Sequence, residues 1–211
     1  MNGAPLWLQA FVALLAVDLY QYLCRRGQHR FEVWWRLHKL HDAPEELTVL
    51  STSRSHIADT MLRQVFGPGL LVYALGLSAN AVIYGSLLPA VLLDALGHAN
   101  IDFPRKRFRW LSYVFSLPNV HALHHTPTHD RVNFGMSLMI WDRFLGTFQM
   151  PDERPCQFGT SDRRFSELGI MAQHLDAFHL RPGSSNALPS VERIRSGPPD
   201  AGPADATTDS I

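Results

Sequence analysis

Apolar residues are gathered into a few long runs in this chain, and these runs limit what it can fold into. Residues 6–23 form a nearly continuous apolar stretch that is about long enough for one helix to cross a bilayer. A signal peptide is the alternative for this run. It fits poorly, because the run has no basic segment before it and no small-residue cleavage site after it. Residues 65–79 and 81–97 are two shorter runs, joined around Ser78–Asn80, and predict a helical hairpin in the membrane. The sequence therefore predicts an all-α, integral membrane helical protein.

Basic residues follow these runs and predict an orientation. Five lie between positions 25 and 39, after the first run, and four lie between positions 105 and 109, after the hairpin. Because basic residues are enriched on the cytosolic side of membrane proteins, we expect both groups to face the cytosol. Residues 107–117 mix aromatic and basic side chains and predict a helix at the membrane surface.

Histidines cluster beside the same segments. His121, His124 and His125 have the spacing i, i+3, i+4 and would share one face of a helix. Such a triplet alone is equally consistent with a histidine-rich surface helix. However, a second cluster lies before the hairpin and His98 lies at its end, so the predicted topology brings these histidines to one side of the membrane. Since neutral imidazole is the commonest protein ligand for transition metals, we expect a metal site in a cytosol-facing, histidine-rich helical cap.

The second cluster, which consists of His29, His38 and His41, requires a bend in the chain. His29 and His38 are nine residues apart and would point in opposite directions from one straight helix. Gly27 is the residue that loosens the helix near this point. We therefore expect the first helix to end before His38.

Two carboxylates inside the apolar runs are candidates for supporting a metal ligand. Asp18 lies within the first apolar run, and an ionisable group inside a membrane helix usually has a function. The alternative is that Asp18 makes a hydrogen bond that packs two helices together. Asp94 precedes His98 by one helical turn and is placed to accept a hydrogen bond from that imidazole, with helix packing again the alternative.

The remaining features restrict the class of protein. With 211 residues, we expect one domain over residues 1–181 and a disordered tail, rich in proline and glycine, over residues 182–211. The formal net charge of zero gives no electrostatic support for a nucleic-acid partner. Cys24 and Cys156 lie far apart in sequence and indicate neither a disulfide framework nor a zinc ribbon.

Taken in order, several motifs resemble the fatty acid hydroxylase / sterol desaturase superfamily. They are Asp18-Leu-Tyr-Gln-Tyr22, Trp35-Arg-Leu-His38-Lys-Leu-His41, Arg54-Ser-His56, His98-Ala-Asn100, Pro118–His125, Asn133-Phe-Gly135 and Trp141–Thr147. The resemblance covers residues 18–150, with histidine boxes at 25–42, 98 and 118–125. It implies an integral membrane oxygenase with two histidine-ligated irons, which uses O2 and reducing equivalents to hydroxylate or desaturate a C–H bond of a membrane lipid.

The resemblance also implies a set of site residues and partners. A separate electron-transfer protein would supply the reductant. Iron is the expected metal, and zinc fits the same imidazoles in a purified sample. Asp18 and Asp94 would support the ligands, and no catalytic residue is expected beyond the ligands themselves. The implied ligands are His29, His38, His41, Asp42, His56, His98, His121, His124 and His125.

Two positions depart from the histidine pattern of this superfamily. Asp42 stands where the second box ends in histidine, and its carboxylate is able to bind iron through oxygen. Arg25 stands at the first histidine of the first box, and a guanidinium has no acceptor and repels a dication. Arg25 therefore leaves open an alternative: an inactive member that keeps the fold and acts as a lipid-binding or interaction protein. A zinc-dependent membrane hydrolase is a third, weaker alternative, because the sequence lacks HExxH.

Overall fold

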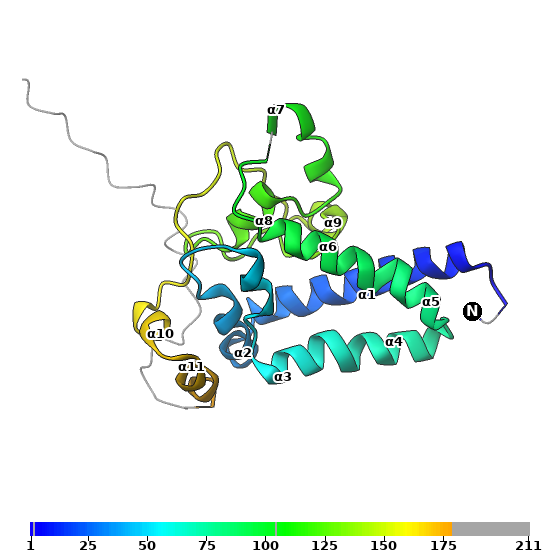
Figure 1. Ribbon diagram of the computed structural model, residues 1–211, viewed down its shortest axis with the longest axis horizontal. Helices are drawn as coiled ribbons and strands as arrows, with labels where there is room; N and C mark the ends of the chain where they lie inside the picture. The colour runs from blue at the N-terminus through cyan, green and yellow to red at the C-terminus, as the bar shows by residue number, and fades with distance from the viewer. Residues whose placement is uncertain (2, 104, 179–211) are drawn as a thin grey trace, which may run out of the picture.

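The computed structural model describes residues 1, 3–103 and 105–178, so the predicted tail over residues 182–211 lies outside the described residues. Within these ranges the chain is helical, apart from one isolated antiparallel bridge between Phe115 and Leu138. Three long helical rods lie side by side and carry a cap of shorter helices at one end (Figure 1). The prediction of an all-α membrane protein is confirmed.

The rods correspond to the apolar runs of the sequence. The first rod is α1 (Leu6–Gln28). The second rod comprises α3 (Ile57–Thr60), the π-helical turn η2 (Met61–Phe66) and α4 (Gly67–Leu75). The third comprises α5 (Ala79–Val82), the π-helical turn η3 (Ile83–Leu87) and α6 (Leu88–Gly97). The first and third rods are long and apolar enough to cross a membrane.

The second and third rods form the predicted hairpin. Gly76 ends α4 in the left-handed conformation, with φ of 60°, and this reverses the chain. The Ser78 hydroxyl then accepts a hydrogen bond of 3.3 Å from the backbone N–H of Ala81 at the start of α5. The N–H of Ser78 donates to Oε1 of Gln9 at 2.9 Å, so the turn is fixed to α1.

Glycines allow the hairpin to pack closely on α1. A Cβ atom added at Gly85 would lie 2.0 Å from the carbonyl oxygen of Ala10, which leaves no room for a side chain. The outer faces of the rods are apolar, and Tyr73 and Leu92 are 85% and 60% exposed. Helices that hydrogen-bond their own backbone and present apolar side chains outward suit a lipid environment.

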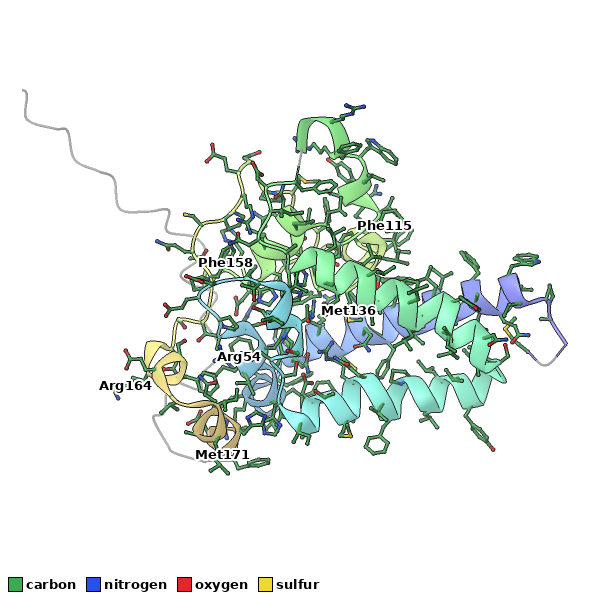
Figure 2. All side chains as sticks on the ribbon, in the orientation of Figure 1. Arg54, Phe115, Met136, Phe158, Arg164 and Met171 are labelled. Carbon is green, nitrogen blue, oxygen red and sulfur yellow. The ribbon has the colours of Figure 1, made fainter. Side chains whose placement is uncertain are left out.

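The cap is built from helices that precede and follow the hairpin. The part before the hairpin is α2 (Glu32–Asp42) and η1 (Val49–Ser53). The part after it comprises α7 (Arg105–Phe108), η4 (Leu111–Tyr113), α8 (Pro118–His124), α9 (Ile140–Leu145), α10 (Arg163–Glu167) and α11 (Ile170–Asp176). Figure 2 labels Met171 on α11 and Arg164 on α10, at the end of the molecule farthest from the α4–α5 turn.

The predicted bend between His29 and His38 is confirmed, because α1 ends at Gln28 and α2 begins at Glu32. The predicted surface helix over residues 107–117 is wrong. Two short helical turns take its place, and the chain then becomes extended, because the N–H of Ser116 donates to the carbonyl of Ser137. The first basic group is also only partly exposed, since Arg25 and Lys39 are buried and Lys39 is paired with Asp162.

Candidate metal centre

Seven histidines converge where the rods meet the cap. They come from the end of α1, from α2, from the end of α6 and from α8, and each is at most 2% exposed: His29, His38, His41, His98, His121, His124 and His125. His29, His98 and His125 each directly follow the last residue of a helix. The carboxyl-terminal end of a helix carries a partial negative charge, which favours a nearby cation. Histidines at these positions are therefore well placed to bind a metal ion.

The converging side chains form two groups. The first group is His29, His38, Asp42 and His124, whose ligand atoms all lie within 4.8 Å of one another. The second group contains His41, His98 and His125, which meet the same criterion. His121 joins the second group, since its Nε2 lies 3.3 Å from Nε2 of His98 and 3.1 Å from Nε2 of His125. A third set, Asp94, His98 and His121, also meets the criterion and shares two histidines with the second group. The structure therefore offers two adjacent candidate sites, each with four side chains.

Asp42 lies between the two groups. Its Oδ2 atom is 3.3 Å from Nε2 of His29, and its Oδ1 atom is 3.5 Å from Nε2 of His38. Oδ1 also lies 3.6 Å from Nδ1 of His125, in the second group. The acidic residue that departs from the histidine pattern is thus part of the cluster.

Most of the imidazoles are held from outside the cluster through Nδ1. The Nδ1–H groups of His124 and His98 donate to the carbonyls of Val132 and Asp94, both at 2.9 Å. Nδ1 of His41 is 3.3 Å from the carbonyl of Arg54. A ring that donates through Nδ1 keeps its Nε2 lone pair free for a metal, so these contacts fix the tautomer a ligand needs.

Three carboxylates lie behind the histidines. Oδ1 of Asp94 is 3.5 Å from Nδ1 of His98, but this Nδ1–H donates to the backbone carbonyl of Asp94 at 2.9 Å, whereas the spacing predicts a hydrogen bond to the carboxylate. Sequence reasoning missed the other two, Asp59 and Asp130, which lie 3.6 Å from Nδ1 of His38 and 3.9 Å from Nδ1 of His29. The position of Asp59, close to a long apolar run, could have marked it as a candidate, because charged residues at membrane helices often have a function. Asp130 lies in a loop, and no sequence pattern indicated it.

The donor set fits a divalent metal. Nε2 of His29, His38, His41 and His124 and both oxygens of Asp42 are buried and have no hydrogen-bond partner among the described residues. Buried polar atoms are normally satisfied, and a metal ion would satisfy these together. Burial lowers the pKa of six of the seven imidazoles well below 6.5, which favours the neutral form that binds a cation: His29, His38, His41, His121, His124 and His125. Burial raises the pKa of Asp42, and the nearby Arg25 guanidinium opposes that rise.

Arg25 lies inside the site without being a ligand. It precedes His29 by one turn of α1 and is 1% exposed. Its Nε and Nη1 atoms are buried without a hydrogen-bond partner in the described part of the chain. Its positive charge also contributes to the lowered pKa of His29. A fixed cation therefore lies beside the place where metal ions would bind.

Two predicted site residues lie elsewhere. His56 is in neither group, because its Nε2 donates to the carbonyl of His174 at 3.1 Å and its Nδ1 accepts from the N–H of Ala58 at 3.1 Å. It caps α3 instead of facing the cluster. The carboxylate of Asp18 accepts hydrogen bonds of 3.0 Å from the Ser137 N–H and the Trp141 Nε1–H. It thus holds the segment before α9 and does not support a histidine.

The motifs after α8 build one wall of the first group. Asn133 adopts a positive φ of 54°, and its side chain donates to the carbonyls of Val120 and Gln149 at 3.0 and 2.8 Å. Asp142 accepts from the N–H groups of Phe134 and Gly135, both at 2.7 Å. These bonds place the Phe134 ring with its centroid 5.4 Å from that of His29 and 5.6 Å from that of His124.

Two clefts lie near the cluster. One lies on the cap side, has free space for about one water molecule and is lined by residues that include Asp42, His124, His125 and Asp130. The other lies beside α1, is equally small and is lined by Leu14, Val17, Asp18, Gln21, Ser86, Ala90, Met136 and Ser137. Met136, labelled in Figure 2, lies in the middle of the molecule between the rods and the cap.

Comparison with known proteins agrees with this architecture. The family model for fatty acid hydroxylase matches residues 10–147, which include Asp42 and all seven converging histidines. The chain belongs to the fatty acid hydroxylase family. No solved structure matches it.

Similar curated proteins include lipid-modifying enzymes. The chain is 31% identical over 149 residues to the ornithine lipid hydroxylase OlsE of Rhizobium tropici, which covers 70% of this chain and 44% of the relative. It is 23% identical over 192 residues to the alkylglycerol monooxygenase of Xenopus tropicalis, covering 84% of this chain and 40% of the relative. The chain therefore spans less than half the length of these family members.

Proposed function

We propose that this member of the fatty acid hydroxylase family is a membrane-bound, non-haem iron oxygenase that hydroxylates or desaturates a C–H bond of a lipid. The observation that carries the proposal is the pair of buried ligand groups at the end of three apolar rods, in which Nε2 of His29, His38, His41 and His124 has no hydrogen-bond partner among the described residues. The names of the relatives, ornithine lipid hydroxylase and alkylglycerol monooxygenase, support a lipid substrate. Bound iron would supply the activation of O2 and the oxidation of the substrate C–H bond.

The residues of the chain have two tasks in this proposal. His29, His38, Asp42 and His124 would hold one ion, and His41, His98, His121 and His125 would hold the other. The outer partners Asp59, Asp94 and Asp130 keep the imidazoles oriented. Imidazole and carboxylate together suit Fe(II), and they also accept zinc.

The two clefts mark places where the two kinds of reactant would approach. The cleft beside α1 is lined by apolar side chains that include Leu14, Val17 and Met136, and it would have to widen to admit a lipid chain. Gln21, one turn of α1 before Arg25, lines the same cleft. The cleft on the cap side reaches Asp42 and His124, where a separate electron-transfer protein would approach. We propose that the cap faces the cytosol, and the exposed Arg26 and Arg30 support this orientation.

The experiment that tests this function is lipid analysis of membranes that contain the protein. Iron-loaded membranes would be supplied with ¹⁸O2, a reductant system and trial lipids that include ornithine lipids and alkylglycerols. We expect one lipid class to gain a single ¹⁸O atom or a double bond. The variants His98→Ala and His124→Ala should lose this product, and His56→Ala should retain it. Absence of any modified lipid with the iron-loaded protein would refute the proposal.

Arg25 is the observation that favours the second candidate function, a family member that binds lipid without turnover. A buried guanidinium beside the ligands opposes the binding of dications. Counting iron per chain in detergent-purified protein separates the two candidates. Two ions per chain support the oxygenase, whereas metal-free protein that still retains lipid supports the binding role.

A further inference from the structure

Six of the seven converging imidazoles share one arrangement, in which Nδ1 is turned away from the metal sites. Three of these Nδ1 atoms face carbonyl oxygens of Arg54, Asp94 and Val132. Those of His29 and His38 face the outer carboxylates Asp130 and Asp59, and that of His121 lies 3.4 Å from the Ser116 hydroxyl. The contacts of His29 and His38, at 3.9 and 3.6 Å, are longer than hydrogen bonds. In each of the six cases the residue that faces the outer atom of the ring is not itself a candidate ligand.

His125 is the exception among them. Its Nε2 is turned toward the second group and lies 3.1 Å from Nε2 of His121. Its Nδ1 is buried without a hydrogen-bond partner in the described structure and faces Oδ1 of Asp42 at 3.6 Å, slightly beyond hydrogen-bond distance. The outer partner of this one imidazole is therefore a residue of the first group.

The other oxygen of Asp42 is turned toward the first group. Oδ2 lies 3.3 Å from Nε2 of His29 and, like Oδ1, is buried without a hydrogen-bond partner. Oδ1 lies 3.5 Å from Nε2 of His38 in the first group and 3.6 Å from Nδ1 of His125 in the second. The carboxylate therefore reaches both groups through this oxygen, and its residue is 3% exposed. A buried carboxylate with two unsatisfied oxygens is costly unless both find a partner.

We propose that Asp42 couples the two metal sites. In this arrangement Oδ2 binds the ion held by the first group, while Oδ1 accepts a hydrogen bond from Nδ1–H of His125, whose Nε2 binds the ion of the second group. An ion on the first group fixes the carboxylate, and the fixed carboxylate selects the His125 tautomer that the second ion requires. The two sites therefore fill cooperatively, with the first group occupied first. This inference rests on the metal centre of the proposed function and is independent of the reaction.

The test is a metal titration of the full-length, detergent-purified, metal-free protein with Co²⁺, followed by its visible absorption spectrum. We expect two ions per chain in the wild type, with the second bound at least as tightly as the first. The variant His98→Ala, which removes a ligand of the second group only, identifies the spectrum of the first site.

Two substitutions of Asp42 separate its two contacts. Asp42→Asn removes the charge from both, and we expect the affinity of the first site to fall about 100-fold and that of the second about tenfold. Asp42→His supplies a ligand to the first site, but its Nδ1–H faces the Nδ1–H of His125, and two donors cannot pair. We therefore expect Asp42→His to bind the first ion within about tenfold of the wild type and to lose about tenfold or more at the second site.

Asp130→Asn is the matched control, because Asp130 lies 3.9 Å from Nδ1 of His29, and no hydrogen bond or ion pair among the described residues joins it to an imidazole of the second group. It should weaken the first site and leave the intrinsic affinity of the second site unchanged. Circular dichroism and size-exclusion chromatography confirm that each variant is folded, and Asp42→His carries the test if Asp42→Asn is not. Equal affinity of the second site in wild type and Asp42→His would overturn the proposal.

The outcomes also separate this inference from the proposed function. If the wild-type protein binds two ions cooperatively but modifies no lipid, the coupling is supported and the oxygenase function is refuted. If the protein modifies lipid but the Asp42 variants leave the affinity of the second site unchanged, the oxygenase function is supported and the coupling is refuted.

Discussion

The carboxylate of Asp59 lies 3.6 Å from Nδ1 of His38, so a residue of the second rod supports a candidate metal ligand of the cap. Asp59 also accepts a hydrogen bond from the amide of Gln28 at the end of α1, and its Oδ2 lies 3.6 Å from Nε of Arg63. This polar contact joins α1, α2 and the hairpin at one point. The position of the metal site is thereby tied to the packing of the membrane helices.

Replacing Asp59 with asparagine should weaken metal binding. A carboxylate behind a ligating histidine orients the ring and raises its basicity, and loss of such a partner costs about 10–100-fold in metal affinity. The measurement is a Co²⁺ or Zn²⁺ titration of purified protein. The exposed Asp102 provides the control, since Asp102→Asn should bind as the wild type does. Unchanged affinity in Asp59→Asn would contradict the supporting role.

Replacing Arg25 with methionine should have opposite effects on the metal-bound and metal-free protein. Methionine keeps much of the length of the side chain and removes a positive charge beside the ligands, so we expect metal affinity to rise by about tenfold or more. In the metal-free protein, the Arg25 guanidinium favours the charged form of the Asp42 carboxylate. Its loss should lower the free energy of unfolding by about 1–3 kcal/mol. Metal titration and thermal unfolding measure the two effects.

Arg26→Met is the control for the Arg25 experiment. Arg26 is exposed, and its guanidinium donates to the hydroxyl of the buried Tyr22 at 3.1 Å. We expect little change in either quantity. A lower metal affinity in Arg25→Met than in the wild type would show that the guanidinium helps to hold the metal site together.

His56→Ala should leave the metal content unchanged. Both ring nitrogens of His56 are used, one for the carbonyl of His174 and one for the N–H of Ala58 at the start of α3. Loss of this helix cap should reduce stability by about 1–2 kcal/mol. Metal analysis of His56→Ala beside His124→Ala checks the distinction. A loss of metal from both variants would return His56 to the set of ligands.

Gly85→Ala should destabilise the bundle. The added Cβ would lie 2.0 Å from the carbonyl oxygen of Ala10, so α1 and the third rod would have to separate, at a cost of about 1–3 kcal/mol. Gly69→Ala in α4 is the matched control, because a Cβ there meets nothing within 4 Å, and alanine is the better helix former by about 0.5–1 kcal/mol. Thermal unfolding in detergent should therefore shift in opposite directions for the two variants.

The sequence allowed the rods and most of the cluster to be predicted. The apolar runs gave the helices of α1 and the hairpin, and the nine-residue separation of His29 and His38 required the observed bend. The spacing of His121, His124 and His125 predicted that they converge, and the first two lie on α8 while His125 directly follows it. These features depend on local periodicity, which a single sequence contains.

What could not be predicted depends on contacts between distant residues. Asp18 interacts with Trp141, which is 123 positions away, and no local pattern indicates that pairing. His56 belongs to a histidine-containing motif, yet its contact with His174 becomes visible only when the second rod meets α11. The extended stretch before α8 arises from pairing with the segment around Ser137, which overrides the helical tendency of residues 107–117.

The places of the ligands along the chain also set an order of assembly. His29, His38 and His41 are synthesised before the hairpin, and His98, His121, His124 and His125 follow it. Neither group is complete until the second arm of the hairpin has returned to the end of the bundle at which α1 ends. Retention of metal would therefore mark chains whose insertion is finished. Chains with a misplaced hairpin would carry four or fewer of the seven histidines on one side and would remain metal-free.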